Sequence, residues 1–545
     1  MSLLMRKRGL DSIGLRRPTR RVALAIGAFI VAAGLAGGPQ GAYADSKPLV
    51  IARDMDLNSL DPSRAYCDTC QIYLNAVYET LLTIAPDNHT LVPVLAQSWE
   101  SNADQTQFTF HLDPRAVFSD GSPVEAKDVK WTFERLANMK ASASYFMDGV
   151  KSIEAPDAHT VVIAMAAPNS EFIGIMAAPN TGIINSKAAI AQGALANADA
   201  ATKDPSEPWF LANSAGSGPY MLDSYKPNDE LRLKVNDKYW RAKPAIDSVV
   251  LRQVKESVAQ AQLLENGGAD IAMQVDPDTA KTINSPDVTV TMAPSYNFLY
   301  FAVSPGAKDV PVPLTKEVRQ AMGYAVDYQG LIDLTLSGNG KLQASPIPNG
   351  FPGAAGLALP VHDLEKAKAL LAKAGHADGF TISARYPNMT IYGVDMNMLM
   401  QKLQQDLAKV NIKAELQPLT FTVWRGQVRG DGIPLTAAFF APDYFGSAQY
   451  VQYFGMVHGA PWAKRAGAER MPELYNKAEE EAAAKALASG GDAMDKAYQD
   501  VGQQMIDDRV IIPIVSPDLV FAYRKDIKGV RYSSCCNMPL ADISR

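Results

Sequence analysis

The chain has 545 residues, which is too long for one small hydrophobic core and long enough for two sizeable lobes. Hydrophobic residues make up 47% of it and charged residues 20%, an ordinary globular composition that excludes a disordered or fibrous chain. The formal net charge is −6 and no basic stripe occurs, which excludes nucleic acid and anionic lipid surfaces as partners.

Residues 1–44 form a basic and then apolar leader. An apolar run from Val22 to Leu35 is shorter than the ~20 residues that span a bilayer. Ala42-Tyr43-Ala44 has the small-x-small pattern that signal peptidases cleave. We therefore expect residues 1–44 to be a cleaved signal peptide, the alternative being a single membrane anchor. The basic residues before the apolar run are Arg6, Lys7, Arg8, Arg16, Arg17, Arg20 and Arg21.

Removal of this leader changes the charge and the location of the chain. The leader carries seven basic residues and one acidic residue, so its loss moves the formal net charge from −6 to about −12. No cysteine stands at the cleavage site, so a lipid anchor is not expected. We predict a soluble periplasmic protein, exported by either the Sec or the twin-arginine route, between which the leader does not distinguish.

Strand and helix patterns alternate along the mature chain, which predicts an α/β fold. In the first half we expect strands at residues 49–52 and 108–112, a helix at 72–82, and a helix capped by Ser122 that runs through Phe133. In the second half we expect a helix at 363–374 that is stopped by Gly375, and a strand at 380–386. No low-complexity linker is present, which favours lobes built from discontinuous segments.

Two further helices carry residues that invite a functional interpretation. Methionines at helical spacing on a helix near 396–410 predict core packing rather than a copper or haem site, because they share one face with leucines. That face holds Met396, Leu399, Met400, Leu403, Leu407 and Val410. The charged, alanine-rich helix at 479–488 is expected to present its polar side to solvent.

Four cysteines form two close pairs, Cys67 with Cys70 and Cys535 with Cys536. In an oxidising compartment an even count favours structural disulfides. Three pairings are open, and a bond between the two pairs would tie the chain ends together. The alternative is a redox or metal site at Cys67-x-x-Cys70, although no histidine is adjacent in sequence.

Common catalytic motifs are missing from the chain. G-x-S-x-G, H-E-x-x-H and the G-x-x-x-x-G-K-[ST] phosphate loop do not occur, and the six histidines are scattered. No carboxylate pair stands out at a spacing that indicates general acid–base catalysis. The sequence therefore predicts no enzyme, no catalytic residue, no cofactor and no metal site.

Seven short segments, in chain order, resemble the extracellular solute-binding proteins of the oligopeptide and dipeptide class, family 5. They follow the order of that family, and the resemblance extends over nearly all of residues 45–530. They are LAQSWE (95–100), FTF (108–110), FSDGSP (118–123), GSGPY (216–220), NDKYWR (236–241), VRQAM (318–322) and AKALL (367–371).

The resemblance implies a two-lobed periplasmic-binding-protein fold, type II-like and of class C, whose lobes close around a ligand. By analogy, lobe I would comprise residues 45–293, with an extra subdomain at about 85–210. Lobe II would comprise 294–512, and 513–545 would return to lobe I. The family further implies a monomer that delivers its ligand to the membrane subunits of an ABC importer.

The resemblance also implies which residues meet the ligand. Phe439-Phe440-Ala441-Pro442-Asp443-Tyr444 resembles the segment whose aspartate pairs with a ligand ammonium, here Asp443, although Phe445-Gly446-Ser447 then departs from the family pattern. Arg385 resembles the position that holds the ligand carboxylate in some dipeptide binders. Tyr66 and the Cys67/Cys70 loop follow the first strand, where relatives place cleft-lining residues. Candidate walls, with core packing as their alternative role, are Tyr296, Asn297, Trp424, Phe440 and Tyr444.

The leading hypothesis is therefore a periplasmic binding protein for peptides or peptide-like solutes. A second hypothesis keeps the scaffold but replaces the ligand with an opine, an oligosaccharide or a metal chelate, because of the departure after Asp443. A third is a redox or metal-handling protein that uses Cys67 and Cys70. A fourth is a receptor that serves a signalling partner.

Overall fold

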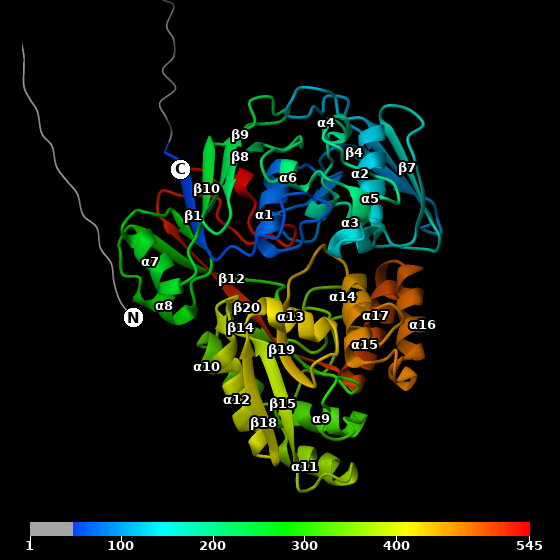
Figure 1. Cartoon of the computed structure of the whole chain (residues 1–545), viewed down its shortest axis with the longest axis vertical. Helices are drawn as coiled ribbons and strands as arrows, with labels where there is room; N and C mark the ends of the chain where they lie inside the picture. The colour runs from blue at the N-terminus through cyan, green and yellow to red at the C-terminus, as the bar shows by residue number, and fades with distance from the viewer. Residues whose placement is uncertain (1–46) are drawn as a thin grey trace, which may run out of the picture. The chain divides into compact units, whose positions relative to one another are not determined.

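The central feature of the fold is a 12-stranded sheet to which both ends of the described chain contribute (Figure 1). The computed structural model describes residues 47–545, so the predicted signal peptide lies outside the described residues. The strand order is β18 (Ile412–Leu419), β15 (Phe380–Pro387), β19 (Leu435–Phe440), β13 (Phe298–Val303), β20 (Ile511–Arg524), β11 (Ile271–Ala272), β1 (Leu49–Arg53), β10 (Ser248–Gln253), β9 (Glu230–Val235) and β8 (Tyr220–Lys226), while β12 (Val288–Pro294) and β14 (Gly340–Leu342) also pair with β20.

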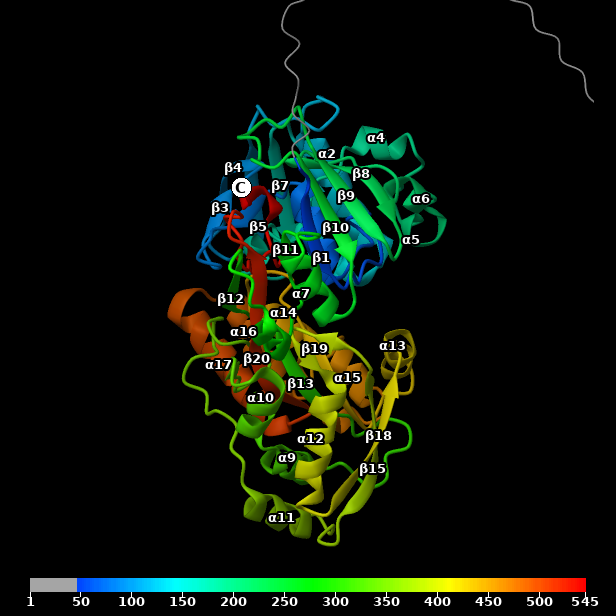
Figure 2. The ribbon, with the colours of Figure 1, turned by 90° about the vertical axis from the view of Figure 1, so that its left-hand side faces the viewer.

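β20 joins the two halves of this sheet. Residues 511–517 of β20 pair with β13 and β14, whereas residues 518–524 pair with β12 and β11. The chain crosses a second time between the end of β12 and the start of β13. We call β1 with β8–β11 the β1 half, and β13 with β15, β18 and β19 the β13 half. β20 runs between the two halves in both views (Figures 1 and 2).

The central strands β13 and β19 are buried on both faces, so their residues are almost all apolar, whereas the edge strand β18 alternates buried residues with exposed polar ones. Leu299, Phe301 and Val303 of β13 face one hydrophobic cluster, and Phe298 and Tyr300 face another. Figure 2 shows α12 lying along β15 and β18. The first cluster takes its helical residues from α9 (Lys316–Ala325), α10 (Tyr328–Leu336), α11 (Leu364–Lys373) and α12 (Met396–Ala408), the second from α13 (Phe421–Arg429), α14 (Ala448–Phe454), α15 (Pro461–Ala466), α16 (Lys477–Leu487) and α17 (Gly491–Asp508).

The β1 half is covered by α1 (Asp68–Val77), and α7 (Ser257–Glu265) and α8 (Pro277–Thr282) pack near β11. A separate sheet with its own core lies in the chain between α1 and β8. Among residues 47–545, no helix combines the length and the apolar character that a membrane crossing requires. The separate sheet has the order β4 (Ala96–Ser101), β5 (Gln107–Leu112), β7 (Thr160–Met165) and β6 (Val150–Glu154), and α2 (Ala126–Met139) and the 3-10 helix η1 (Ser142–Met147) contribute to its core.

Most predicted elements are confirmed. The strands expected at 49–52, 108–112 and 380–386 are β1, β5 and β15. Asp363 caps α11, and Gly375 follows its end with a φ of +81°. The methionines of α12 are confirmed as core residues, since Met396 and Met400 are fully buried.

The expected N-terminal boundaries of two helices are wrong. The helix predicted at 72–82 begins at Asp68 and ends at Val77. α2 begins at Ala126, where Glu125 and Asp128 form a reciprocal capping box. Ser122 does not cap α2, because its hydroxyl and its backbone N–H both donate to Asp120 in the preceding turn.

The predicted solvent-facing polar side of the 479–488 helix is wrong at Glu479. This residue of α16 is fully buried, and its Oε2 accepts only the backbone N–H of Met456, at 3.3 Å. Burial, together with the negative charge of the neighbouring Asp508, raises the pKa of Glu479 to about 8 against the opposing effect of the Met456 N–H. The alanine-rich composition of α16 gave no sign of this, because the burial comes from packing beneath α14.

The wild type should lose stability as the pH rises, because Glu479 is buried, and we expect Glu479→Gln to abolish this loss. Because the folded-state pKa of about 8 exceeds the ordinary value of 4.5, the folded protein binds a proton that the unfolded chain releases, so stability falls through that interval. The wild type should lose roughly 1.4 kcal/mol of unfolding free energy per pH unit there relative to the variant. Urea unfolding at pH 5 and pH 8 measures this difference. Glu481→Gln, on an exposed side of α16, is the control. Parallel pH profiles for wild type and Glu479→Gln would contradict the assignment.

Candidate ligand-binding cavity

A cavity of about 510 Å³ lies between the β1 half and the β13 half. Its volume is within the ~300–1,000 Å³ of typical small-molecule sites. The lining from the first part of the chain is Asp54, Met55, Asp56, Asn58, Tyr66, Cys67, Asp68, Gln71, Asn180 and Gln274, and from the later part it is Tyr300, Met389, Thr390, Ile391, Tyr392, Phe421, Trp424, Arg425, Val428, Arg429, Phe439, Phe440, Ala441, Asp443, Tyr453 and Arg465.

Asp443 is the buried carboxylate of this cavity. It follows β19, and only 6% of it is exposed. Its Oδ2 accepts hydrogen bonds from the hydroxyls of Tyr66 and Tyr145, each at 2.6 Å. Tyr66 precedes α1 and Tyr145 lies in η1, so the two donors come from the opposite side of the cavity. Oδ1 of Asp443 has no hydrogen-bond partner within residues 47–545, which leaves it available to a ligand.

The electrostatics of Asp443 follow from its burial. Loss of solvent raises its pKa to about 6, and the hydrogen bonds from Tyr145 and Tyr66 oppose that rise. Burial also raises the pKa of both tyrosines, so they remain neutral donors at neutral pH. The carboxylate is therefore ionised at pH 7 but costly to keep charged without a cation beside it.

Aromatic rings form the wall beside Asp443. Trp424 of α13 is held by a 2.9 Å hydrogen bond from its Nε1 to the hydroxyl of Thr436. Phe421 stacks on Trp424 with ring centroids 5.6 Å apart, and Phe440 lies 4.8 Å from Tyr453. Rigid aromatic sides with few polar groups are typical of ligand pockets.

The charges of the cavity are divided between its two sides. Asp54, Asp56 and Asp68 come from the segment around the end of β1 and the start of α1. Three arginines, Arg425 and Arg429 of α13 and Arg465 of α15, come from the β13 half. Such a division suits a ligand that carries charges of both signs.

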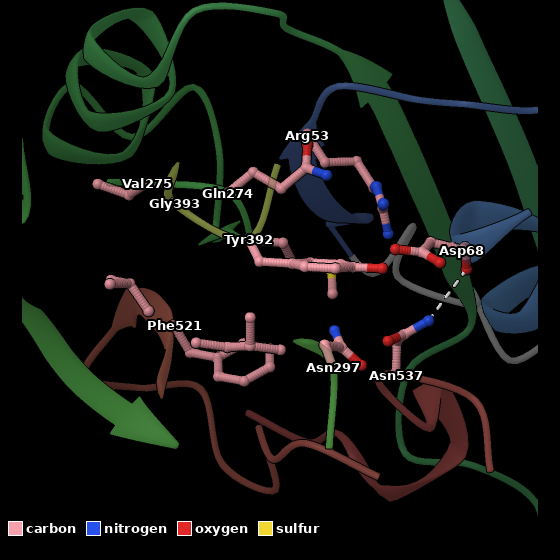
Figure 3. Close-up of a pocket in the computed structure, with 12 residues that line it drawn as sticks. Arg53, Asp68, Gln274, Val275, Asn297, Tyr392, Gly393, Phe521 and Asn537 are labelled. Atoms are coloured by element: carbon pink, nitrogen blue, oxygen red, sulfur yellow. Dashed lines mark hydrogen bonds between the residues drawn. The ribbon is translucent and has the colours of Figure 1, made fainter. Parts of the chain in front are cut away.

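A smaller cavity of about 30 Å³ shares Asp68, Gln274 and Tyr392 with the larger one (Figure 3). In this view the Tyr392 hydroxyl and the end of the Arg53 side chain both point toward the Asp68 carboxylate. Burial, together with the negative charge of Asp56, raises the pKa of Asp68 to about 7 against the opposing charge of Arg53. Asn297 also lines this smaller cavity, where its Oδ1 accepts from the Tyr532 hydroxyl at 3.4 Å.

The structure brings the sulfur atoms of Cys67 and Cys70 into bonding contact, and likewise those of Cys535 and Cys536. Each close pair in sequence is therefore a pair in space. Cys67 caps α1, with its sulfur accepting the N–H of Cys70 at 3.0 Å, and it lines the large cavity. Within residues 47–545, no group of three or more histidine, cysteine, aspartate or glutamate side chains is arranged to hold a metal ion.

The model of the bacterial extracellular solute-binding proteins, family 5, matches residues 90–459, which is more than half of the chain. The chain is a family 5 extracellular solute-binding protein. A probable D,D-dipeptide-binding periplasmic protein of Escherichia coli, DdpA, is 27% identical over 88% of this chain and 90% of its own length.

Solved structures show that this binding protein has the two-lobed periplasmic-binding-protein fold. The binding protein DppA of Helicobacter pylori, solved with the peptide STSA, has a TM-score of 0.78 at 20% identity and covers 91% of this chain and 98% of its own. AgaA of A. tumefaciens R10, solved with agropinic acid, has a TM-score of 0.77 at 22% identity with the same coverage. The α/β class and the family expected from sequence are both confirmed.

The predicted site residues of this solute-binding protein fall into two groups. Asp443, Trp424 and Phe440 line the large cavity together. Arg385 does not, because its Nη1 donates to Gln427 at 3.0 Å and its Nη2 lies 3.9 Å from Asp309. Its function as a carboxylate clamp stays a prediction.

The other predicted walls also lie outside the large cavity. Tyr444 is buried, with its hydroxyl 3.4 Å from Oε2 of Glu171. Tyr296 packs edge-to-face on Phe351 with centroids 5.0 Å apart. Asn297, in the smaller cavity, is 1% exposed. These three residues therefore have the core-packing surroundings that were their alternative.

Tyr145 and the three arginines were not predicted. Tyr145 is 298 residues from Asp443 in sequence, and no local pattern connects them. Arg425 and Arg429 are four residues apart on a helix, so their shared face was visible in the sequence. That spacing alone does not say whether the face meets solvent or a cavity.

Proposed function

We propose that this protein captures a peptide or peptide-like solute in the large cavity. The observation that carries the proposal is the buried Asp443 carboxylate, with Oδ2 held by two tyrosines and Oδ1 free. A ligand ammonium at Oδ1 would make a charge-assisted hydrogen bond and offset the desolvation of the carboxylate. One similar protein is named as a probable D,D-dipeptide-binding protein, and another was solved with the peptide STSA. Both ligands support a solute with a free amine.

We further propose that the two halves of the large sheet belong to lobes that close around the ligand. Lobe I would comprise residues 45–293, including a subdomain at about 85–210 around the separate sheet, and lobe II 294–512, with 513–545 returning to lobe I. The crossings at β20 and between β12 and β13 would be the hinge. Two sets of hydrogen bonds between the proposed lobes suit a closed form. The hydroxyls of Tyr66 and Tyr145 donate to Asp443. The backbone N–H groups of Ser447 and Ala448 donate to Glu171.

The cellular setting of the proposal follows from the family and the leader. We propose cleavage after Ala44, a periplasmic monomer without a lipid anchor, and delivery of the solute to ABC permease subunits. The protein would carry out no catalysis, and its cysteines would form two structural disulfides, Cys67–Cys70 and Cys535–Cys536.

The cysteine hypothesis has a separate test. Thiol titration of denatured protein isolated from the periplasm, with metal analysis of the same sample, should find neither free thiols nor bound metal. Four titratable thiols or a stoichiometric metal would instead favour a redox or metal-handling protein.

The proposed function is tested by ligand release and by amine blocking. Mass spectrometry of the small molecules released from denatured protein should identify a solute with a free amine. Calorimetry should then show that N-acetylation of a bound peptide abolishes its binding, since an amide cannot replace the ammonium at Asp443. Equal binding of free and acetylated peptides would contradict the proposal, and release of a sugar would leave the transport function but replace the ligand.

A further inference from the structure

The large cavity contains three arginines without acidic partners. Arg425, Arg429 and Arg465 all line it, yet within residues 47–545 none of them has a carboxylate oxygen within 4.0 Å. Other arginines of the chain, such as Arg135 and Arg545, are paired with aspartates. A group of unpaired cations in an acidic protein needs a physical reason.

Arg425 and Arg465 place like charge beside Arg429. Partial burial lowers the pKa of Arg429, and the positive charges of Arg425 and Arg465 act in the same direction. Arg425 and Arg429 lie four residues apart on α13, a spacing at which like charges destabilise a helix. An anion among the three groups would reverse this cost.

Arg465 is already held in place for such an anion. Its Nη1 donates to the Tyr453 hydroxyl at 3.1 Å, and its guanidinium lies 4.9 Å from the centroid of the Trp462 ring. These contacts fix the side chain, and the remaining N–H groups of its guanidinium have no acceptor among residues 47–545. Pre-organised donors lose little entropy when a ligand binds.

The acidic side of the cavity differs, because two of its three carboxylates accept hydrogen bonds from the protein. Asp56 accepts the backbone N–H groups of Asp68 and Thr69, both at 2.9 Å. Asp54 accepts Nε2 of Gln253. Asp68, with its pKa near 7, is partly neutral. Asp54 and Asp56 are therefore hydrogen-bonded within the protein, whereas Oδ1 of Asp443 and the guanidinium groups of Arg425 and Arg429 have no hydrogen-bond partner among residues 47–545.

We propose that the ligand carries two or more acidic groups, which bind Arg425, Arg429 and Arg465, in addition to the amine that binds Asp443. A carboxylate forms a two-bond pair with one guanidinium, so a single ligand carboxylate would leave at least one of the three unmatched. The class is an amino-acid conjugate or short peptide with an acidic side chain near its carboxyl end. This inference rests on the proposed function for its amine, but its acidic half has an independent readout.

Calorimetry with matched peptides tests the inference. Ala-Glu and Ala-Gln have nearly the same shape and differ by one charge, and we expect Ala-Glu to bind at least tenfold more tightly. The double variant Arg425→Gln/Arg429→Gln should reduce this preference to less than twofold, whereas Arg425→Lys/Arg429→Lys should retain part of it. Lys464→Gln removes a charge from an exposed position beside Arg465 and should preserve the full preference.

Each outcome decides between the two proposals. Equal affinity for Ala-Glu and Ala-Gln would overturn the acidic-ligand inference and leave peptide capture standing. A solute released from the purified protein with fewer than two acidic groups would also overturn it. Tight binding of a non-peptide polyacid, with no binding of any peptide, would overturn the proposed function and support the acidic-ligand inference.

Discussion

Replacing Asp443 with asparagine is expected to weaken binding of an amine-bearing ligand about 100-fold and to raise the melting temperature of the unliganded protein. Loss of one member of a buried charge pair costs binding roughly 2–5 kcal/mol. Without ligand, the same carboxylate is a buried charge whose neutral replacement can still accept from Tyr66 and Tyr145. Calorimetry and thermal unfolding of the ligand-free protein measure the two effects.

The control for this variant is Asp431→Asn, which removes a largely exposed carboxylate from the same half of the sheet. It should change neither the affinity nor the melting temperature measurably. An Asp443→Asn protein that binds as tightly as the wild type would show that the ligand amine, if present, lies elsewhere.

The pH dependence of binding should have the opposite sign from that of stability. In the unliganded protein the pKa of Asp443 is about 6, and a bound ligand ammonium would lower it. The affinity for the ligand should therefore fall as the pH drops below 6, by up to about tenfold per pH unit. In the unliganded protein the raised pKa makes the contribution of Asp443 to stability decline as pH rises from about 4 to 6. Both trends should vanish in Asp443→Asn.

Replacing Arg135 with alanine is expected to destabilise the protein by about 3–5 kcal/mol. Arg135 of α2 is fully buried, and its two terminal nitrogens donate to the two oxygens of Asp61 at 2.7 and 2.6 Å. The second nitrogen also donates to Asp204 at 3.2 Å. Its removal leaves two buried carboxylates with Arg64 as their one remaining basic partner among residues 47–545. Chemical unfolding of the ligand-free protein measures the loss.

Arg115→Ala is the matched control, because Arg115 pairs with Asp113 but its side chain is 78% exposed. An exposed pair contributes about 0–1 kcal/mol. If Arg135→Ala cost no more than Arg115→Ala, the buried network would have no energetic significance for the fold. Retained ligand affinity in the folded fraction would show that the network acts on stability and not on the cavity.

Strands and helix ends were predictable because their determinants are local. The apolar run of β1, the alternating pattern of β15 and the Asp363 and Gly375 boundaries of α11 depend on neighbouring residues alone. The capping box of α2 was also present in the sequence, but the nearby Ser122 offered a competing cap. In such a case the tertiary fold decides which polar residue becomes the cap.

The site was only partly predictable, because its parts meet through long-range packing. Asp443 was identified through the resemblance of its flanking aromatic segment to family members. Arg385 resembled a family position, yet the structure points its guanidinium at Gln427 rather than into the cavity. The burial of Glu479 and the approach of Tyr145 to Asp443 depend on segments distant in sequence.

The central position of β20 has a consequence for the order in which the chain becomes structured. β11, which is made early, and β13, which is made later, have their common neighbour in residues 511–524. Contacts between residues so far apart in sequence slow folding, because a long loop must close, at a cost in entropy, before the stabilising contacts can form. Synthesis from the N-terminus therefore yields a chain with an incomplete sheet in both halves until its last segment emerges.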